Sequence, residues 1–183
     1  VWTEIVLEKI CNQAKTLVEN GHESEAAMLT GYMRELVPGD ETNREGHAAK
    51  VYFNALFGKN FSRGQENPIN AALNYGYGLI LSAFNREVTL CGYLTHIDNM
   101  FNPYNLSCDM MEPFRAIVDR KVVDIAPVEF GKKEKQELLG ILHSPVRIAG
   151  TEQTVMNAVK IYSRSVFEAI ELADADRLNF IEL

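Results

Sequence analysis

Apolar residues recur at helical spacing along most of the chain. The first such stripe consists of Trp2, Ile5, Ile10, Ala14 and Leu17. It ends at Asn20-Gly21, a pair typical of helix C-termini. The same periodicity predicts further helices over residues 26–36, 42–58, 68–84, 106–122, around 138–142 and over 155–170. The pattern therefore indicates an all-α protein, a multi-helix bundle with enough apolar faces to form a core.

Breaks in this periodicity predict the connections between the helices. Pro38-Gly39-Asp40 reads as a turn, and residues 97–105 read as a loop. A short strand is predicted at residues 146–148, because Pro145 and Gly150 flank an apolar run there. Gly76 and Gly78 interrupt the fourth helix, and each costs about 1 kcal/mol relative to alanine. We therefore expect another backbone to pack closely against that helix.

The composition is that of an ordinary globular domain. The chain has 183 residues, of which 46 % are apolar and 23 % charged, and this excludes wholesale disorder. The length fits one domain over residues 1–183. The three cysteines have no metal-type spacing and fit a reducing cytoplasm. No stretch is long and apolar enough for a transmembrane helix. Because the first residue is Val1 and no signal peptide follows, we expect a fragment of a longer protein.

Two isolated residues are candidates for chemistry, although each has a simpler explanation. Glu45 lies in the first turn of a predicted helix within the run EGHAAKVYF. Taken alone, the spacing from Thr42 to Glu45 favours a capping box over a functional acid. His96 follows an apolar stretch, and a lone histidine there is more often a hydrogen-bonded structural residue.

A pair of acids lies in the run LSCDMMEPFR. Asp109 and Glu112 are three residues apart and would share one helix face, where two carboxylates repel each other unless a cation or proton lies between them. Pro113 has no amide proton for the carbonyl of Asp109, so a kink is expected there. The alternative is a solvated helix start in which Arg115 pairs with Asp119.

Together these residues would make a site of mostly oxygen ligands. Glu45, Glu112 and a neutral His96 are a donor set that suits Mg²⁺ or Mn²⁺ and does not suit structural zinc. Such a site assists reactions at phosphate. The three residues are remote in the sequence, so the sequence alone does not show that they meet.

Five stretches, in order, give the chain a family resemblance: WTEIVLEKICNQAKTL, PGDETNREGHAAKVYFNALFG, FSRGQENPINAALNYGYGLIL, HIDNMFNPYNLSCDMMEPFR and VRIAGTEQTVMNAVKIYSRSV. The chain resembles the CRISPR-associated adaptation integrase, the catalytic "protein one" of that system, in its type II branch. The resemblance implies the C-terminal helical catalytic domain. The family's N-terminal β-rich domain has no counterpart here.

The resemblance also implies a ligand set. In the family, the metal is held by residues that match Glu45, His96 and Glu112, which would be the catalytic residues. Asp109 matches a supporting acid, and Tyr75 resembles a tyrosine near the site. His47 lies within a matched motif, at a position where the family needs no ligand.

The implied activity is metal-dependent DNA integration. The 3′-hydroxyl of a captured foreign-DNA end would attack a phosphodiester of the CRISPR repeat, and water as nucleophile would make the same site an endonuclease. The implied partners are double-stranded DNA, a second copy of the chain, a small central adaptation subunit and other type II CRISPR proteins. No membrane is implied.

The net charge of −7 opposes simple DNA binding, which needs neutralisation of the phosphates. Local basic residues are candidates for this role, and each is also compatible with a solvated helix face. They are Lys59, Arg63, Arg115, Arg120, Lys121, Lys132, Lys133 and Lys135. Two rival functions remain open: a non-catalytic helical scaffold of a DNA-processing complex, and a phosphohydrolase that acts on small nucleotides in a closed pocket.

Overall fold

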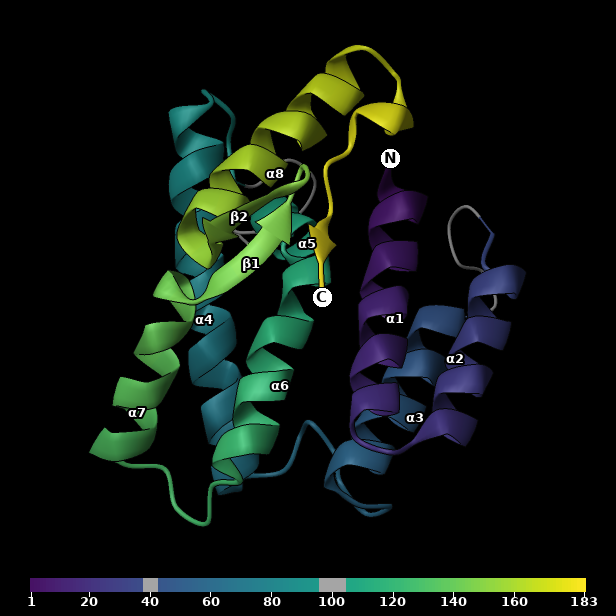
Figure 1. Cartoon of the computed structure of the whole chain (residues 1–183), viewed down its shortest axis with the longest axis vertical. Helices are drawn as coiled ribbons and strands as arrows, with labels where there is room; N and C mark the ends of the chain where they lie inside the picture. Colours follow the sequence, from purple (N-terminus) through teal and green to yellow (C-terminus); the bar gives the residue numbers. More distant parts are fainter. Residues whose placement is uncertain (38–42, 96–104) are drawn as a thin grey trace.

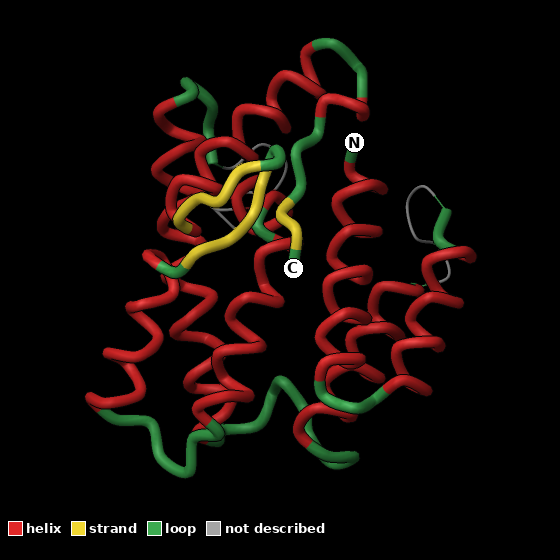
Figure 2. The backbone as a smooth tube through the Cα atoms, in the orientation of Figure 1, coloured by secondary structure: helices red, strands yellow, loops and turns green. Residues whose placement is uncertain are grey.

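The computed structural model describes residues 1–37, 43–95 and 105–183, and it is predominantly helical (Figures 1 and 2). The α-helices are α1 (Trp2–Glu19), α2 (Glu23–Glu35), α3 (Arg44–Phe57), α4 (Pro68–Leu90), α5 (Asn105–Met110), α6 (Arg115–Ile125), α7 (Lys132–Leu139) and α8 (Val155–Glu171). Short 3-10 turns are η1 (Glu112–Phe114), η2 (Gly140–His143) and η3 (Ala175–Arg177). The predicted all-α class is confirmed. The predicted turn at 38–40, the cap at Thr42, His96 and the loop up to residue 104 lie outside the described residues.

A small sheet accompanies the helices. It consists of β1 (Pro145–Ile148), β2 (Thr151–Thr154) and β3 (Ile181–Glu182), in the antiparallel order β2-β1-β3 (Figure 2). The strand predicted at 146–148 is confirmed as part of β1, whose Val146 and Ile148 are buried while its other two side chains face out. The sequence did not predict β2 and β3, because β2 is entirely polar and β3 has only two residues.

The apolar side chains form two clusters. The smaller one joins α1, α2 and α3 around Ile10, Leu29 and Tyr52, and these three helices lie together on one side of the molecule (Figure 1). The larger cluster joins α4 to α8 and the sheet, together with Ile5 of α1, and it includes Phe84 and Tyr162, whose ring centres are 5.9 Å apart. We call these two parts the N-terminal lobe, residues 1–37 and 43–57, and the C-terminal lobe, residues 68–95 and 105–183.

Helix α4 packs closely against α6. A methyl group built on Gly76 would meet the side chain of Val118 on α6, so a neighbouring helix does come close at this glycine, but through a side chain and not through the expected backbone. The same expectation was wrong for Gly78, where a methyl group would meet nothing within 4 Å. No helix within the described ranges combines the length and the apolar character that crossing a membrane requires.

The helix predicted over 106–122 is broken at its middle. It divides into α5, η1 and α6 around Pro113, as the missing amide proton of that residue predicts. The break brings η1 against α1, where the side-chain amide of Asn12 donates a buried hydrogen bond to the carbonyl of Pro113 (3.2 Å). The residue next to this anchored carbonyl is Glu112.

Candidate metal and active site

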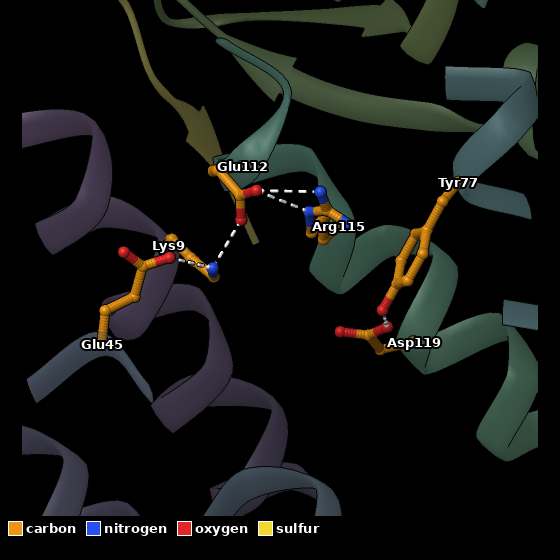
Figure 3. A network of polar contacts seen from close by, with 6 residues as sticks. All are labelled: Lys9, Glu45, Tyr77, Glu112, Arg115 and Asp119. Carbon is orange, nitrogen blue, oxygen red and sulfur yellow. Dashed lines mark hydrogen bonds and ion pairs between the residues drawn. The ribbon is translucent and has the colours of Figure 1, made fainter. Parts of the chain in front are cut away.

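Two of the predicted ligands meet at one lysine between the lobes. The Nζ atom of Lys9, on α1, lies 2.5 Å from Glu45 Oε1 on α3 and 2.6 Å from Glu112 Oε2 on η1 (Figure 3). The contact to Glu45 is a hydrogen bond, whereas the contact to Glu112 is an ion pair without hydrogen-bond geometry. One cation therefore bridges two acids that are far apart in the sequence.

Arg115 fixes the other oxygen of Glu112. Its Nε and Nη2 atoms both lie 2.9 Å from Glu112 Oε1, within the first turn of α6 (Figure 3). The side chain of Glu112 is only 15 % exposed, compared with 36 % for Glu45. Glu112 is thus held from two sides, and Glu45 forms the more open edge of the site.

Asp109 is the third acid of this group. Its pKa is raised, first by burial and then by the negative charges of Glu112 and Glu45, while Arg115 and Lys9 act in the opposite direction. The three carboxylates are therefore within electrostatic reach of one another. Asp109 also lines a pocket of about 400 Å³ that includes Trp2 and Phe167.

The sequence did not predict a buried hydrogen-bond network that lies beside Arg115 and is centred on Asp119. Asp119 is 1 % exposed and accepts hydrogen bonds from the hydroxyls of Tyr52 (2.9 Å) and Tyr77. The guanidinium of Arg115 lies 4.8 Å from the centre of the Tyr77 ring. Burial raises the pKa of Asp119 to about 6, against the effects of the two hydroxyls and of the nearby arginines.

The alternative interpretation, a solvated pair between Arg115 and Asp119, is therefore wrong, because Asp119 is buried and bonded to tyrosines while Arg115 pairs with Glu112. One sequence signal could have identified the network. Asp119 falls on the same inward stripe as Val118 and Val122, and an acid on such a stripe needs buried partners.

The other predicted site residues are distributed around this centre. The described N-cap of α3 is Asn43, whose side chain makes no capping hydrogen bond. The ring of Tyr75 packs on Phe130, with 5.7 Å between ring centres, and the neighbouring Tyr77 is the tyrosine that joins the polar network. His47 is exposed and lies beside the ring of Tyr32.

Several of the basic candidates are already engaged within the fold. Arg120 pairs with Glu19 at 2.8 Å, and Lys121 lies 3.6 Å from Glu137. Arg63 donates hydrogen bonds to Asn70 and Asn74. Lys59, which is exposed, lines a surface pocket of about 350 Å³ together with Lys50 and Arg63.

The two carboxylates that contact Lys9 are ligands of the kind that a hard divalent cation prefers. The two carboxylate oxygens contact the same nitrogen, so they are no more than about 5 Å apart, and one ion with ligand distances of about 2.0–2.3 Å needs only a small adjustment of either side chain. Among residues 1–37, 43–95 and 105–183 no ready-made group of three or more His, Cys, Asp or Glu ligands occurs. His96, the third predicted ligand, is not among the described residues.

Comparison with known proteins identifies the family. Residues 1–136 match the family described as CRISPR associated protein Cas1. The chain belongs to the Cas1 family. It is 34 % identical over 192 residues to the CRISPR-associated endonuclease Cas1 of Neisseria meningitidis serogroup C, an alignment that covers all of this chain and 63 % of the relative. A Cas1 endonuclease of Thermus thermophilus is 29 % identical over 143 residues, which cover 69 % of this chain and 42 % of that protein.

Two solved structures share the fold of this Cas1-family chain. The Cas6-RT-Cas1–Cas2 complex superposes with a TM-score of 0.75 at 16 % identity, over 97 % of this chain and 24 % of that one. A casposase bound to integration product gives a TM-score of 0.71 at 17 % identity, over 94 % of this chain and 64 % of that one. The chain spans less than two thirds of the length of these relatives.

Proposed function

We propose that this chain is the catalytic domain of a CRISPR adaptation integrase, a metal-dependent enzyme that inserts foreign-DNA fragments into the CRISPR array. Membership of the Cas1 family supports the class of activity. The observation that carries the catalytic assignment is the convergence of Glu45 and Glu112, from different lobes, on one cationic group. Two carboxylates repel each other unless a positive group lies between them, and a divalent cation would meet that requirement at this point.

The residues that would hold Mg²⁺ or Mn²⁺ are Glu45, Glu112 and His96, with Asp109 as the supporting acid. When bound, such a cation reduces the negative charge on the phosphate and favours deprotonation of the attacking hydroxyl. The protein supplies the geometry. Arg115 keeps one oxygen of Glu112 occupied, so the other is directed toward Glu45, and the partial exposure of Glu45 leaves an edge that DNA can approach.

The proposed reaction is a transesterification. The 3′-oxygen of the captured DNA end forms a bond to phosphorus in the repeat strand, and the bond from that phosphorus to its leaving 3′-oxygen breaks. The attacking hydroxyl loses a proton and the leaving oxygen gains one, so no redox partner is needed. With water in place of the DNA hydroxyl, the same displacement nicks the strand.

The proposed partners are double-stranded DNA, a second copy of the chain, a small central adaptation subunit and other type II CRISPR proteins, in the bacterial cytoplasm. The printed descriptions of the two structural neighbours name a Cas1–Cas2 complex and an integration product, which is in keeping with such partners. An assembly would also distribute the DNA phosphates over several subunits, so that a single chain of net charge −7 need not neutralise all of them.

Replacement of either acid by its amide tests this function. In the assembled protein with its small partner and Mn²⁺, Glu45→Gln or Glu112→Gln should reduce strand transfer into a repeat-bearing plasmid by roughly 100-fold or more, because a metal ligand is lost. Far-ultraviolet circular dichroism should stay unchanged. Glu137→Gln, an acid that pairs with Lys121, is the matched control and should keep full activity. Strand transfer at the wild-type rate by Glu112→Gln would remove that residue from the site.

A non-catalytic scaffold is the second candidate, and one observation favours it. Lys9 already neutralises both carboxylates, as it would in a purely structural junction between the lobes. On this alternative, the two amide variants would weaken folding or assembly, and no divalent cation would bind. The catalytic proposal instead expects intact assembly with lost strand transfer.

A further inference from the structure

The Lys9 ammonium occupies the point where the two acids meet. Its side chain is only 11 % exposed, and its nitrogen lies 2.5 Å from Glu45 and 2.6 Å from Glu112 (Figure 3). Lysine side chains usually extend into water, because an ammonium is strongly hydrated. Here the side chain of Lys9 points from α1 into the space between α3 and η1. Contacts to two carboxylates replace the water that would otherwise hydrate its ammonium.

A divalent cation that binds both acids has to enter the space that this nitrogen fills. Two positive groups cannot share a site of this size, because they repel strongly at a separation of a few ångströms. We propose that Lys9 is a built-in counter-cation that holds Glu45 and Glu112 together without metal and must be displaced when a divalent cation binds. Lys9 thereby sets the metal concentration at which the site fills. This inference rests on the proposed metal-dependent function.

The surroundings give the displaced ammonium an acceptor. Asp109 is exposed and lies within electrostatic reach of Lys9 and of the same two acids. The flexible four-carbon stem of lysine allows its charge to move while the helix stays in place. Exchange of the two cations then requires a change of side-chain rotamer and no movement of either lobe.

Direct measurement of Mn²⁺ binding tests the inference. Titration followed by electron paramagnetic resonance, on the chain itself, would compare the wild type with Lys9→Met and with the control Lys15→Met. Lys15 is on the same helix, but its ammonium contacts Asn12. Lys9→Met should bind Mn²⁺ roughly tenfold or more tightly than the wild type, because the competing charge is gone. Lys15→Met should match the wild type.

Whereas Lys9→Met should bind Mn²⁺ more tightly than the wild type, it should be less stable than the wild type without metal. Without metal, its thermal midpoint should fall, because two partly buried carboxylates lose their counter-charge. Saturating Mn²⁺ should restore the midpoint to that of the wild type with metal. Equal Mn²⁺ affinity in the wild type and Lys9→Met would overturn the role of Lys9.

A second measurement needs no variant. Acetylation of lysine amines in the wild-type chain, followed by mass spectrometry, reports how accessible each amine is. Mn²⁺ should raise the labelling rate of Lys9 several-fold and leave that of Lys15 unchanged. An unchanged rate at Lys9 in a chain that does bind Mn²⁺ would contradict displacement.

The outcomes separate this inference from the proposed function. Failure of both the wild type and Lys9→Met to bind Mn²⁺ would overturn the metal site itself, and the role of Lys9 with it. Binding by both chains at the same affinity would leave the metal site standing and overturn only the counter-cation. Binding by Lys9→Met alone would support the counter-cation in its strongest form.

Discussion

Asp119 is a titratable acid buried in the interior of the fold. It is buried on α6 and accepts hydrogen bonds from Tyr52 on α3 and from Tyr77 on α4. Burial raises its pKa to about 6, compared with about 4 for an exposed aspartate. The folded state therefore binds this proton more tightly than the unfolded state does. The contribution of Asp119 to stability consequently falls as the pH rises from about 4 through its folded pKa of about 6, and it is constant above about pH 7.

Replacement of Asp119 by Asn should remove this pH dependence. Relative to the variant, the free energy of unfolding of the wild type should decline by about 2 kcal/mol between pH 4 and pH 6, as the raised pKa requires. Urea unfolding at several pH values provides the measurement. Asp124→Asn, at an exposed position on the same helix, should keep the wild-type profile. Parallel profiles for the wild type and Asp119→Asn would show that Asp119 does not titrate in this range.

The sequence could identify the acids of the site and could not identify their cation. Glu45 and Glu112 belong to motifs, and two acids three residues apart already suggest a cation nearby. Lys9 belongs to no such pattern, since a lysine on an amphipathic helix is usually solvated. Its role depends on which way α1 faces when the two lobes meet, and this is a property of the tertiary structure.

At the scale of elements, the crossing of α4 and α6 depends on one missing side chain. Gly76 leaves room for Val118, whereas Gly78, two residues further along α4, faces open space. A glycine in a helix costs about 1 kcal/mol relative to alanine. That cost is offset at Gly76 by close packing and is not offset in this way at Gly78.

The two glycines should therefore respond oppositely to alanine. Gly76→Ala should lower the free energy of unfolding by about 1–3 kcal/mol, because the added methyl group forces Val118 away. Gly78→Ala should raise it by about 0.5–1 kcal/mol through helix propensity. Urea titration of both variants measures the difference. Stabilisation by both substitutions would mean that α4 and α6 separate at little cost.

Helical elements were predictable from the sequence because each buries one apolar stripe, and the break at Pro113 followed from its missing amide proton. Strands β2 and β3 were not predictable in this way. Their residues pair with β1 through the backbone, and Arg147, on β1, pairs with Glu182 on β3 at 3.4 Å. Backbone pairing of this kind leaves little trace in side-chain periodicity.

At the scale of the whole molecule, polar contacts between described residues connect the lobes at several places. Besides the Lys9 site, Asn12 donates to the carbonyl of Pro113, Tyr52 donates to Asp119, and Arg120 pairs with Glu19. The family motifs implied candidate ligands, but not that Glu45 and Glu112 lie between two separately packed clusters. Apolar periodicity assigns residues to a core without saying how many cores there are.

Charge is distributed unevenly over this acidic chain. Lys59 is exposed beside Lys50 and Arg63, whereas Lys121 lies near Glu137. On the proposed function, Lys59→Ala should weaken duplex DNA binding several-fold and reduce the dependence of affinity on salt by about one counterion. Lys121→Ala should change both much less, because its charge is partly compensated. Fluorescence anisotropy at several salt concentrations measures this, and equal losses for the two variants would contradict a DNA path along Lys59.

Helix α1 presents Lys9 and Asn12 on the same side, three residues apart. One bridges the acids, and the other anchors the carbonyl beside Glu112. Two separate contacts therefore fix the rotation of α1 about its own axis. A single residue inserted between the start of α1 and Lys9 would rotate the parts of the helix before and after the insertion by about 100° relative to each other. If the downstream part keeps its place, the insertion is absorbed in the first turn; if it turns, the lysine and the asparagine leave their partners together.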